Sequence, residues 1–90
     1  MHTIKAEILQ RLCYTPLVYE RINKKLNARL SNSEIEAYIR CVLEQTSAEN
    51  FCKTGKNYYA RNSENNIIVC INSNTFRVIT VDRITKKVNE

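Results

Sequence analysis

The strongest constraint on the fold is a change in hydrophobic period near residue 51. Before that point, apolar residues recur at helical spacing, as at Ile35, Tyr38, Ile39 and Val42. After it, β-branched residues form short extended runs such as Ile67–Ile71. Because the helices precede the strands instead of alternating with them, the pattern predicts an α+β domain.

The first half of the chain predicts three helices, over residues 3–13, 16–28 and 32–46. Pro16 suits the first position of the second helix. Ser31 and Glu34 have the spacing of a capping box before the third helix. Residues 46–50 are then expected to form a linker.

The second half predicts an antiparallel meander. Residues 51–61, around Gly55, fit either a tight hairpin or one interrupted strand, and two more strands are expected over 67–71 and 75–84. Strict alternation would place Arg77, Ile79, Val81 and Arg83 on one face of the last strand, and Phe76, Val78, Thr80, Asp82 and Ile84 on the other.

These elements predict one domain, residues 1–90. Three N-terminal helices, within residues 1–49, are expected to pack on one face of a three- to four-stranded antiparallel meander, within residues 50–84. The other face is then free for function. Residues 85–90 are expected to be a frayed tail.

Charge is spread unevenly along the chain. The net charge is +5, but residues 1–49 hold seven Lys and Arg against six Asp and Glu, whereas residues 50–90 hold seven against three. The excess therefore belongs to the sheet-forming half. It predicts an anionic partner, either RNA or an acidic or nucleic-acid-binding protein.

Several function classes are disfavoured by what the sequence lacks. The four cysteines form no C-x-x-C pair and His2 is the only histidine, which argues against a zinc site. Carboxylates are too sparse for metal-dependent phosphoryl chemistry, so neither a metal nor another cofactor is expected. Cys13, Cys41 and Cys70 fall among apolar residues and are expected to be buried. No apolar run approaches the about 20 residues that span a bilayer, so a cytoplasmic protein with reduced thiols is expected.

Cations and phenols of the strand-forming half are the candidate functional groups. RNA can be cut without histidine, because its 2′-hydroxyl supplies the nucleophile and cations stabilise the charge that grows on the phosphate. The candidate catalytic residues are Lys53, Lys56, Tyr59 and Arg77, and the candidate nucleic-acid-binding residues are Tyr58, Arg61, Thr80 and Arg83. Tyrosines stack on bases and arginines bind phosphate. One of the two adjacent tyrosines must face the core, because neighbours on a strand alternate faces.

Two resemblances add to these expectations. The segments Gly55–Tyr59 and Ile71–Ile84, together with Phe51 and Leu17–Leu26, resemble an uncharacterised family of short bacterial and phage-borne proteins. The order of elements and the closing segment Thr75–Val81 resemble more loosely the small ribonuclease toxins, a superfamily that includes barnase, colicin-type tRNases and RelE-like mRNA interferases. The second resemblance implies cleavage by Lys, Arg and Tyr.

Two functions from different classes follow. The first is a small basic RNA-directed domain, a metal-independent endoribonuclease of toxin type. The alternative is a non-enzymatic mobile-element protein that binds and inhibits a host defence nuclease complex of CRISPR-like type. A homodimer is compatible with both functions, since the last strand is expected to leave an exposed edge.

Overall fold

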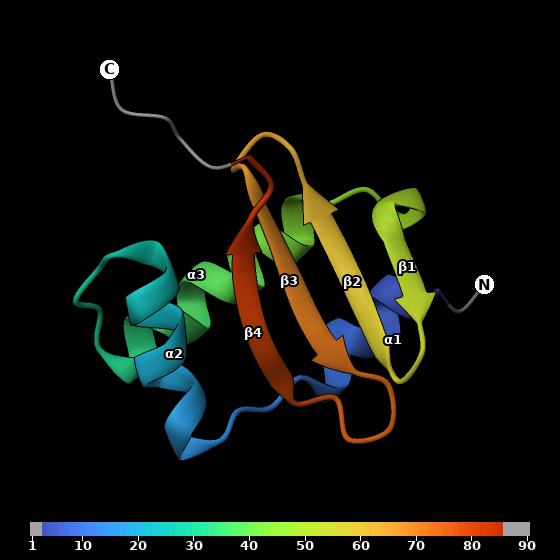
Figure 1. Ribbon diagram of the computed structural model, residues 1–90. Helices are drawn as coiled ribbons and strands as arrows, with labels where there is room; N and C mark the ends of the chain where they lie inside the picture. Colours follow the sequence, from blue (N-terminus) through green and yellow to red (C-terminus); the bar gives the residue numbers. More distant parts are fainter. Residues whose placement is uncertain (1–2, 86–90) are drawn as a thin grey trace.

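The computed structural model describes residues 3–85 and confirms the α+β class. Its helices are α1 (Ile4–Arg11), α2 (Pro16–Leu26) and α3 (Asn32–Gln45), followed by the short 3-10 helix η1 (Ala48–Asn50). The strands are β1 (Phe51–Thr54), β2 (Asn57–Asn62), β3 (Ile67–Asn72) and β4 (Val78–Arg83). They form one antiparallel sheet in the order β1-β2-β3-β4 (Figure 1).

Local side-chain chemistry explains where the helices begin. Thr3 accepts a hydrogen bond from the Ala6 N–H at 3.1 Å, and Pro16 is the first residue of α2. Ser31 and Glu34 form the expected capping box, with bonds of 3.1 and 2.8 Å. The three predicted helices therefore exist, and the observed ones end one or two residues earlier.

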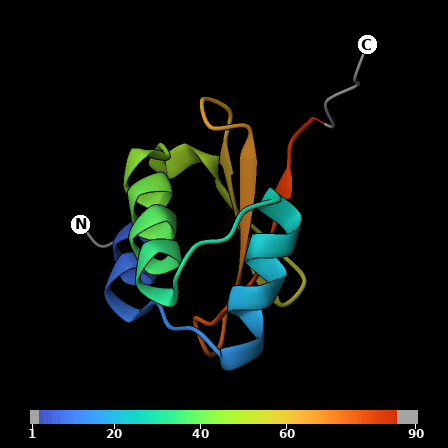
Figure 2. The ribbon, with the colours of Figure 1, turned by 90° about the vertical axis from the view of Figure 1, so that its left-hand side faces the viewer.

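The three helices do not all pack against the same part of the sheet. Helices α1 and α3 lie behind one face, whereas α2 lies beside the edge of β4, against which it chiefly packs (Figures 1 and 2). Apolar side chains of all three helices, such as Ile8, Ile22 and Ile39, are fully buried in one core with the inner face of the sheet. The opposite face of the sheet is not covered by a helix, as expected.

Residues that precede α2 cover the edge of β4. The Cys13 N–H donates to the Phe76 carbonyl at 3.0 Å, and the Cys13 carbonyl accepts from the Val78 N–H at 2.9 Å. Cys13 and Arg77 form a short parallel bridge. The exposed edge expected at the last strand is therefore occupied, and among residues 3–85 the uncovered sheet edge belongs to β1.

The register assigns side chains to the two faces. Phe51, Ala60, Val69 and Val81 pair across the four strands, and all are buried. The neighbouring row of paired residues lies on the opposite, uncovered face. The register also settles the first hairpin: residues 51–62 form two strands with a tight turn, in which Gly55 has the positive φ of 62° that a type II′ turn requires.

A β-bulge corrects the alternation predicted for the last strand. Cys70 pairs with Thr80 and Ile71 with Val78, which leaves Ile79 as the extra residue. Val78 and Val81 are consequently both buried, although strict alternation put them on opposite faces. The strand also begins later than predicted, at Val78.

Three smaller expectations concern the cysteines, the linker after the third helix and the C-terminal tail. Cys70 is buried and Cys13 half-buried, but the prediction of a buried Cys41 is wrong because Cys41 lies on the exposed side of α3. Thr46, expected in a linker, is buried and donates to the Val42 carbonyl at 2.7 Å. Thr85 exchanges hydrogen bonds with Asn66, and the rest of the expected frayed tail, residues 86–90, lies outside the described residues.

Candidate anion-binding groove

The structure separates the candidate residues proposed from the sequence. Tyr59 and Thr80 belong to one row of the uncovered face, in which both pair with Cys70. Lys53 pairs with Tyr58 on the helix-covered face, so Lys53 and Tyr59 lie on opposite sides of the sheet.

The other candidates lie at the margins of the sheet. Tyr58 contacts Phe76, with ring centroids 6.2 Å apart, and packs against the core. Lys56 lies in the β1–β2 turn, and Arg77 precedes β4. Arg83 donates to the Leu26 carbonyl of α2 at 3.4 Å. The candidate residues thus do not form one cluster.

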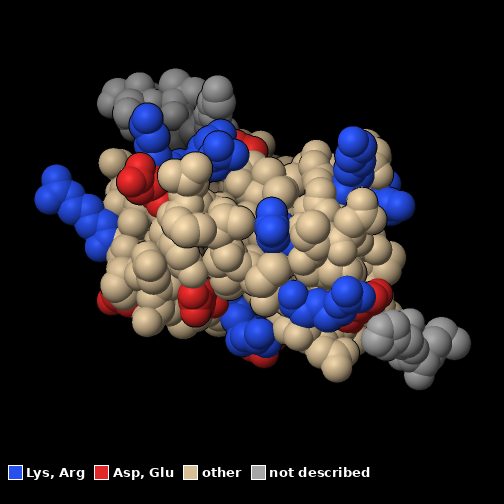
Figure 3. Space-filling model, turned by 90° about the horizontal axis from the view of Figure 1, so that it is seen from below, with Lys and Arg blue, Asp and Glu red and all other residues tan. Residues whose placement is uncertain are grey.

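The uncovered face is polar but carries no net charge. By strand alternation it presents one Arg, one Asp, one Tyr, one Ile and a set of small polar and thiol side chains: Cys52, Thr54, Asn57, Tyr59, Arg61, Ile68, Cys70, Asn72, Thr80 and Asp82. This corrects the interpretation of the sheet as a surface decorated with cations. Figure 3, which looks from below at the end with the turn loops, shows Lys and Arg side chains in separate groups on a largely uncharged surface.

Cations do converge in a groove between α2 and β4, which we call the α2–β4 groove. Its upper half, toward the C-terminal ends of both elements, has a volume of about 570 Å³ and is lined by Arg21, Lys24, Lys25 and Thr80. Its lower half, of about 260 Å³, is lined by Thr15, Leu17, Val18, Arg21, Arg77, Val78 and Ile79. Arg21 lines both halves, which together have four cations and no carboxylate among their lining residues.

Backbone and side-chain contacts hold some of these cations in place. The Arg21 Nη1 donates to the Ile79 carbonyl at 3.4 Å. The Lys25 Nζ lies 2.6 Å from Asp82 Oδ1, so an adjacent carboxylate partly neutralises Lys25. The side chains of Lys24 and Arg77 make no hydrogen bond or ion pair within residues 3–85, which leaves their charges available to a ligand.

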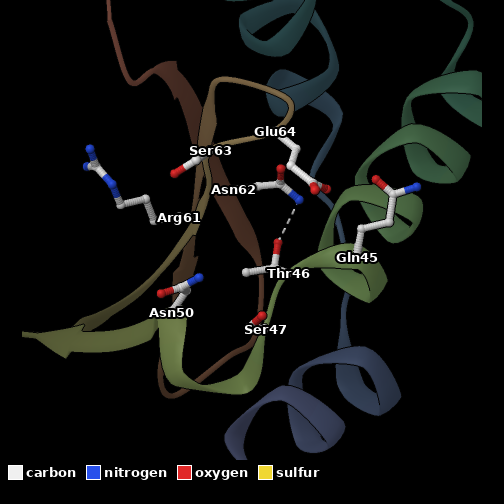
Figure 4. Close-up of a pocket in the computed structure, with 8 residues that line it drawn as sticks. All are labelled: Gln45, Thr46, Ser47, Asn50, Arg61, Asn62, Ser63 and Glu64. Carbon is white, nitrogen blue, oxygen red and sulfur yellow. Dashed lines mark hydrogen bonds between the residues drawn. The ribbon is translucent and has the colours of Figure 1, made fainter.

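A second hollow lies at the opposite end of the sheet, with a volume of about 220 Å³ (Figure 4). At its centre the buried Asn62 amide donates to the Val42 carbonyl and to Thr46 Oγ1, both at 3.1 Å, and its oxygen accepts from the Asn65 N–H at 2.9 Å. These bonds use its hydrogen-bonding groups internally, which indicates a structural role.

The charges around this second hollow are balanced. Arg61 and Glu64 are the only charged residues that line it, and Figure 4 shows the Arg61 side chain pointing away from Asn62. The hollow therefore offers a ligand less than the α2–β4 groove does.

The buried Cys70 thiol, in the row of Tyr59 and Thr80, is not reactive. Burial raises the pKa of the Cys70 thiol, and a hydrogen bond with Tyr59 only partly opposes that shift. Cys70 is therefore protonated at neutral pH and is not a nucleophile.

Sequence reasoning missed the wall that α2 contributes to the groove. Lys24 and Lys25 lie in the last turn of α2, where the helix dipole by itself already accounts for cations. Their spacing from Arg21 on one flank of α2, beside the apolar stripe of Val18 and Ile22, marks a cationic stripe. The strand that this stripe faces is determined by tertiary packing and not by the local sequence.

The described residues also bear on the expected absence of metal and membrane. Among residues 3–85, no three His, Cys, Asp or Glu side chains come together in a way that could hold a metal ion. In the same part of the chain, none of the helices has the length and apolarity that crossing a bilayer requires.

Comparison with known proteins identifies a family and no activity. Neither a curated protein nor a solved structure matches the chain, so no match supports the resemblance to small ribonuclease toxins. A family profile matches residues 6–82, which include all three helices beyond the start of α1 and nearly the whole sheet. The chain therefore belongs to the family described as protein of unknown function DUF3781.

Proposed function

We propose that this protein is an RNA-binding domain that holds the phosphate backbone of a single strand in the α2–β4 groove. The observation that carries the proposal is the groove itself, two hollows that share Arg21 and are lined by four cations and by no carboxylate. Proteins that bind single-stranded nucleic acid without sequence preference use a positively charged groove of this kind.

The uncovered sheet face supports the same proposal. Thr80 lines the groove and also belongs to the row of Tyr59 and Cys70. Two strand spacings, about 10 Å, separate the backbones of Thr80 and Tyr59. A strand of RNA with phosphates in the groove could therefore place a base on the Tyr59 ring, where stacking does not depend on base identity.

Cleavage is a finer proposal, which the arrangement supports less than binding. The 2′-hydroxyl would attack the adjacent phosphate, held by Arg77 and Arg21, to form a 2′,3′-cyclic phosphate while the bond from phosphorus to the 5′-oxygen of the next nucleotide breaks. Water would take up the 2′-hydroxyl proton, and Tyr59 would deliver a proton to the leaving 5′-oxygen. Lys53 cannot join Tyr59 at one phosphate, since the sheet lies between them. A metal-independent ribonuclease would thus rely on Arg77 and Tyr59 and not on the full set predicted from the sequence.

One experiment tests both levels of the proposal. The purified protein is titrated into a fluorescently labelled single-stranded RNA in EDTA, and the same samples are run on a denaturing gel. Lys24→Gln is the test variant, and Lys5→Gln is the matched control, because Lys5 lies on α1 and donates to the Glu44 carbonyl away from the groove. We expect binding by the wild type and by Lys5→Gln, and weaker binding by Lys24→Gln.

The results of this experiment separate three cases. Intact RNA with groove-dependent binding would support the binding domain alone, whereas cleavage lost in Arg77→Ala would support the ribonuclease. Absence of binding by folded protein would contradict both. That result would favour the alternative function, inhibition of a host defence nuclease complex by a mobile-element protein, which stays a prediction.

A further inference from the structure

The two halves of the α2–β4 groove differ in chemistry. The upper half is lined by three cations and a hydroxyl, whereas the lower half has an aliphatic floor. Val18 and Val78 are buried there, and Leu17 beside them is 75% exposed. Leu17 is the more exposed of the two large apolar side chains that stand out on the surface of residues 3–85; the other, Ile4, is 41% exposed.

Leu17 and the half-buried Ile79 are the accessible aliphatic side chains of the lower half, and they lie beside Arg21 and Arg77. The lower half, of about 260 Å³, is larger than the cavity of about 150 Å³ that holds a benzene molecule in an engineered protein core. It therefore has room for a branched aliphatic side chain from outside.

The charges of the lower half indicate which groups of the ligand should flank that aliphatic side chain. Arg21 and Arg77 stand among its lining residues, and no carboxylate is among them. Both guanidinium groups can form paired hydrogen bonds with carboxylates. A ligand that fills the aliphatic floor would hence gain from carboxylates on either side of its apolar residue.

The lower half offers no platform for base stacking, so RNA would contact it only through phosphates at Arg21 and Arg77. Its lining includes no aromatic ring on which a base could stack, because Tyr58 is packed in the core and Tyr59 lies on the uncovered face. An aliphatic floor with arginines at its margin fits a peptide better than a nucleotide.

We propose that the lower half of the α2–β4 groove docks a short segment of a partner protein in which an aliphatic residue is flanked by acidic residues. Leu17 and Ile79 would contact the aliphatic side chain, and Arg21 and Arg77 would pair with the flanking carboxylates. This inference shares Arg21 and Arg77 with the RNA proposal, but it rests on the aliphatic floor, which RNA binding does not need.

The test uses three labelled synthetic peptides and fluorescence anisotropy. The first peptide has two central leucines flanked on each side by two glutamates, the second has serines in place of the leucines, and the third has lysines in place of the glutamates. We expect the first to bind and the other two to bind at least about tenfold more weakly, as the loss of a buried leucine or of the charge pairing predicts.

Protein variants assign the binding to the lower half. Leu17→Ser changes an exposed side chain and should leave the fold intact, yet it should weaken binding of the leucine peptide by about tenfold. Lys24→Gln, in the upper half, should bind that peptide like the wild type. Leu17→Ser should also bind RNA like the wild type, so the two proposals can fail separately.

Three results would overturn the inference: no binding of the leucine peptide, equal binding of the serine peptide, or equal binding by wild type and Leu17→Ser. The circular dichroism spectrum of Leu17→Ser is measured alongside to establish that the variant is folded.

Discussion

The salt dependence of RNA binding gives the most quantitative test of the groove. Each phosphate neutralised on a single strand contributes about −0.7 to the slope of the logarithm of the binding constant against the logarithm of salt concentration. Arg21, Lys24, Lys25 and Arg77 line the groove, and Lys25 is shared with Asp82. Three to four neutralised phosphates predict a slope between about −2 and −3.

Lys24→Gln removes one cation that has no partner within residues 3–85. We therefore expect its slope to be shallower than that of the wild type by about 0.7. The assay is anisotropy of a labelled single-stranded RNA at several KCl concentrations between 50 and 200 mM. An unchanged slope in Lys24→Gln would contradict a contact between Lys24 and a phosphate, and an equally shallow slope in Lys5→Gln would mean that the net charge of the protein and not the groove governs binding.

A substitution that should tighten RNA binding, instead of weakening it, complements this test. Asp82 lies at the margin of the groove and holds Lys25 at 2.6 Å. Asp82→Asn removes the competing carboxylate and releases the ammonium group to the ligand, so RNA should bind more tightly and the slope should become steeper. Weaker binding by Asp82→Asn would contradict the location of the phosphate track.

Two further predictions concern stability. Asn62→Ala removes the buried amide that binds Thr46 and the Asn65 backbone, and it should lower the free energy of unfolding by about 2 kcal/mol in urea titrations; a loss below about 0.5 kcal/mol would contradict this structural role. The hydrogen bond from Tyr19 to the Glu36 carboxylate, 2.6 Å long, raises the pKa of Tyr19 from 10.0 to about 12. Because this pKa is higher in the folded state, the stabilisation is present below pH 10 and is lost between pH 10 and 12. The difference in unfolding free energy between wild type and Tyr19→Phe should therefore shrink from pH 9 to pH 11, and a constant difference would refute the assignment.

Local signals predicted the helical half of the fold well. The capping box at Ser31 and the apolar spacing of Ile35 and Ile39 need only neighbouring residues, so α3 was predicted to within one residue at its C-terminal end. The β4 register depends on a partner strand. The bulge at Ile79 arises where β4 pairs with β3, and the period of two residues that sequence reasoning assumes does not contain it.

The candidate site shows the same division between local and tertiary information. Arg77 and Thr80 were singled out as a cation and a hydroxyl of the strand-forming half. The packing of α2 beside β4, instead of across the inner face, brings Arg21 and Lys24 to them. That packing depends on contacts between residues more than 50 positions apart, which no local pattern encodes.

Core packing and backbone hydrogen bonds, not surface side chains, determine the shape of the lower half of the groove. Phe76 has a left-handed φ of 60°, an unfavourable conformation for an aromatic residue, yet it is buried and lies under the Arg11 guanidinium, 4.4 Å from the ring centroid. That backbone geometry turns its carbonyl toward the Cys13 N–H and ties the start of α2 to β4. The spacing of the groove walls is thus set by Phe76 packing and by backbone bonds. Substitutions at Leu17 or Lys24 should consequently change the chemistry of the groove without changing its shape, which is what makes them interpretable tests of a ligand.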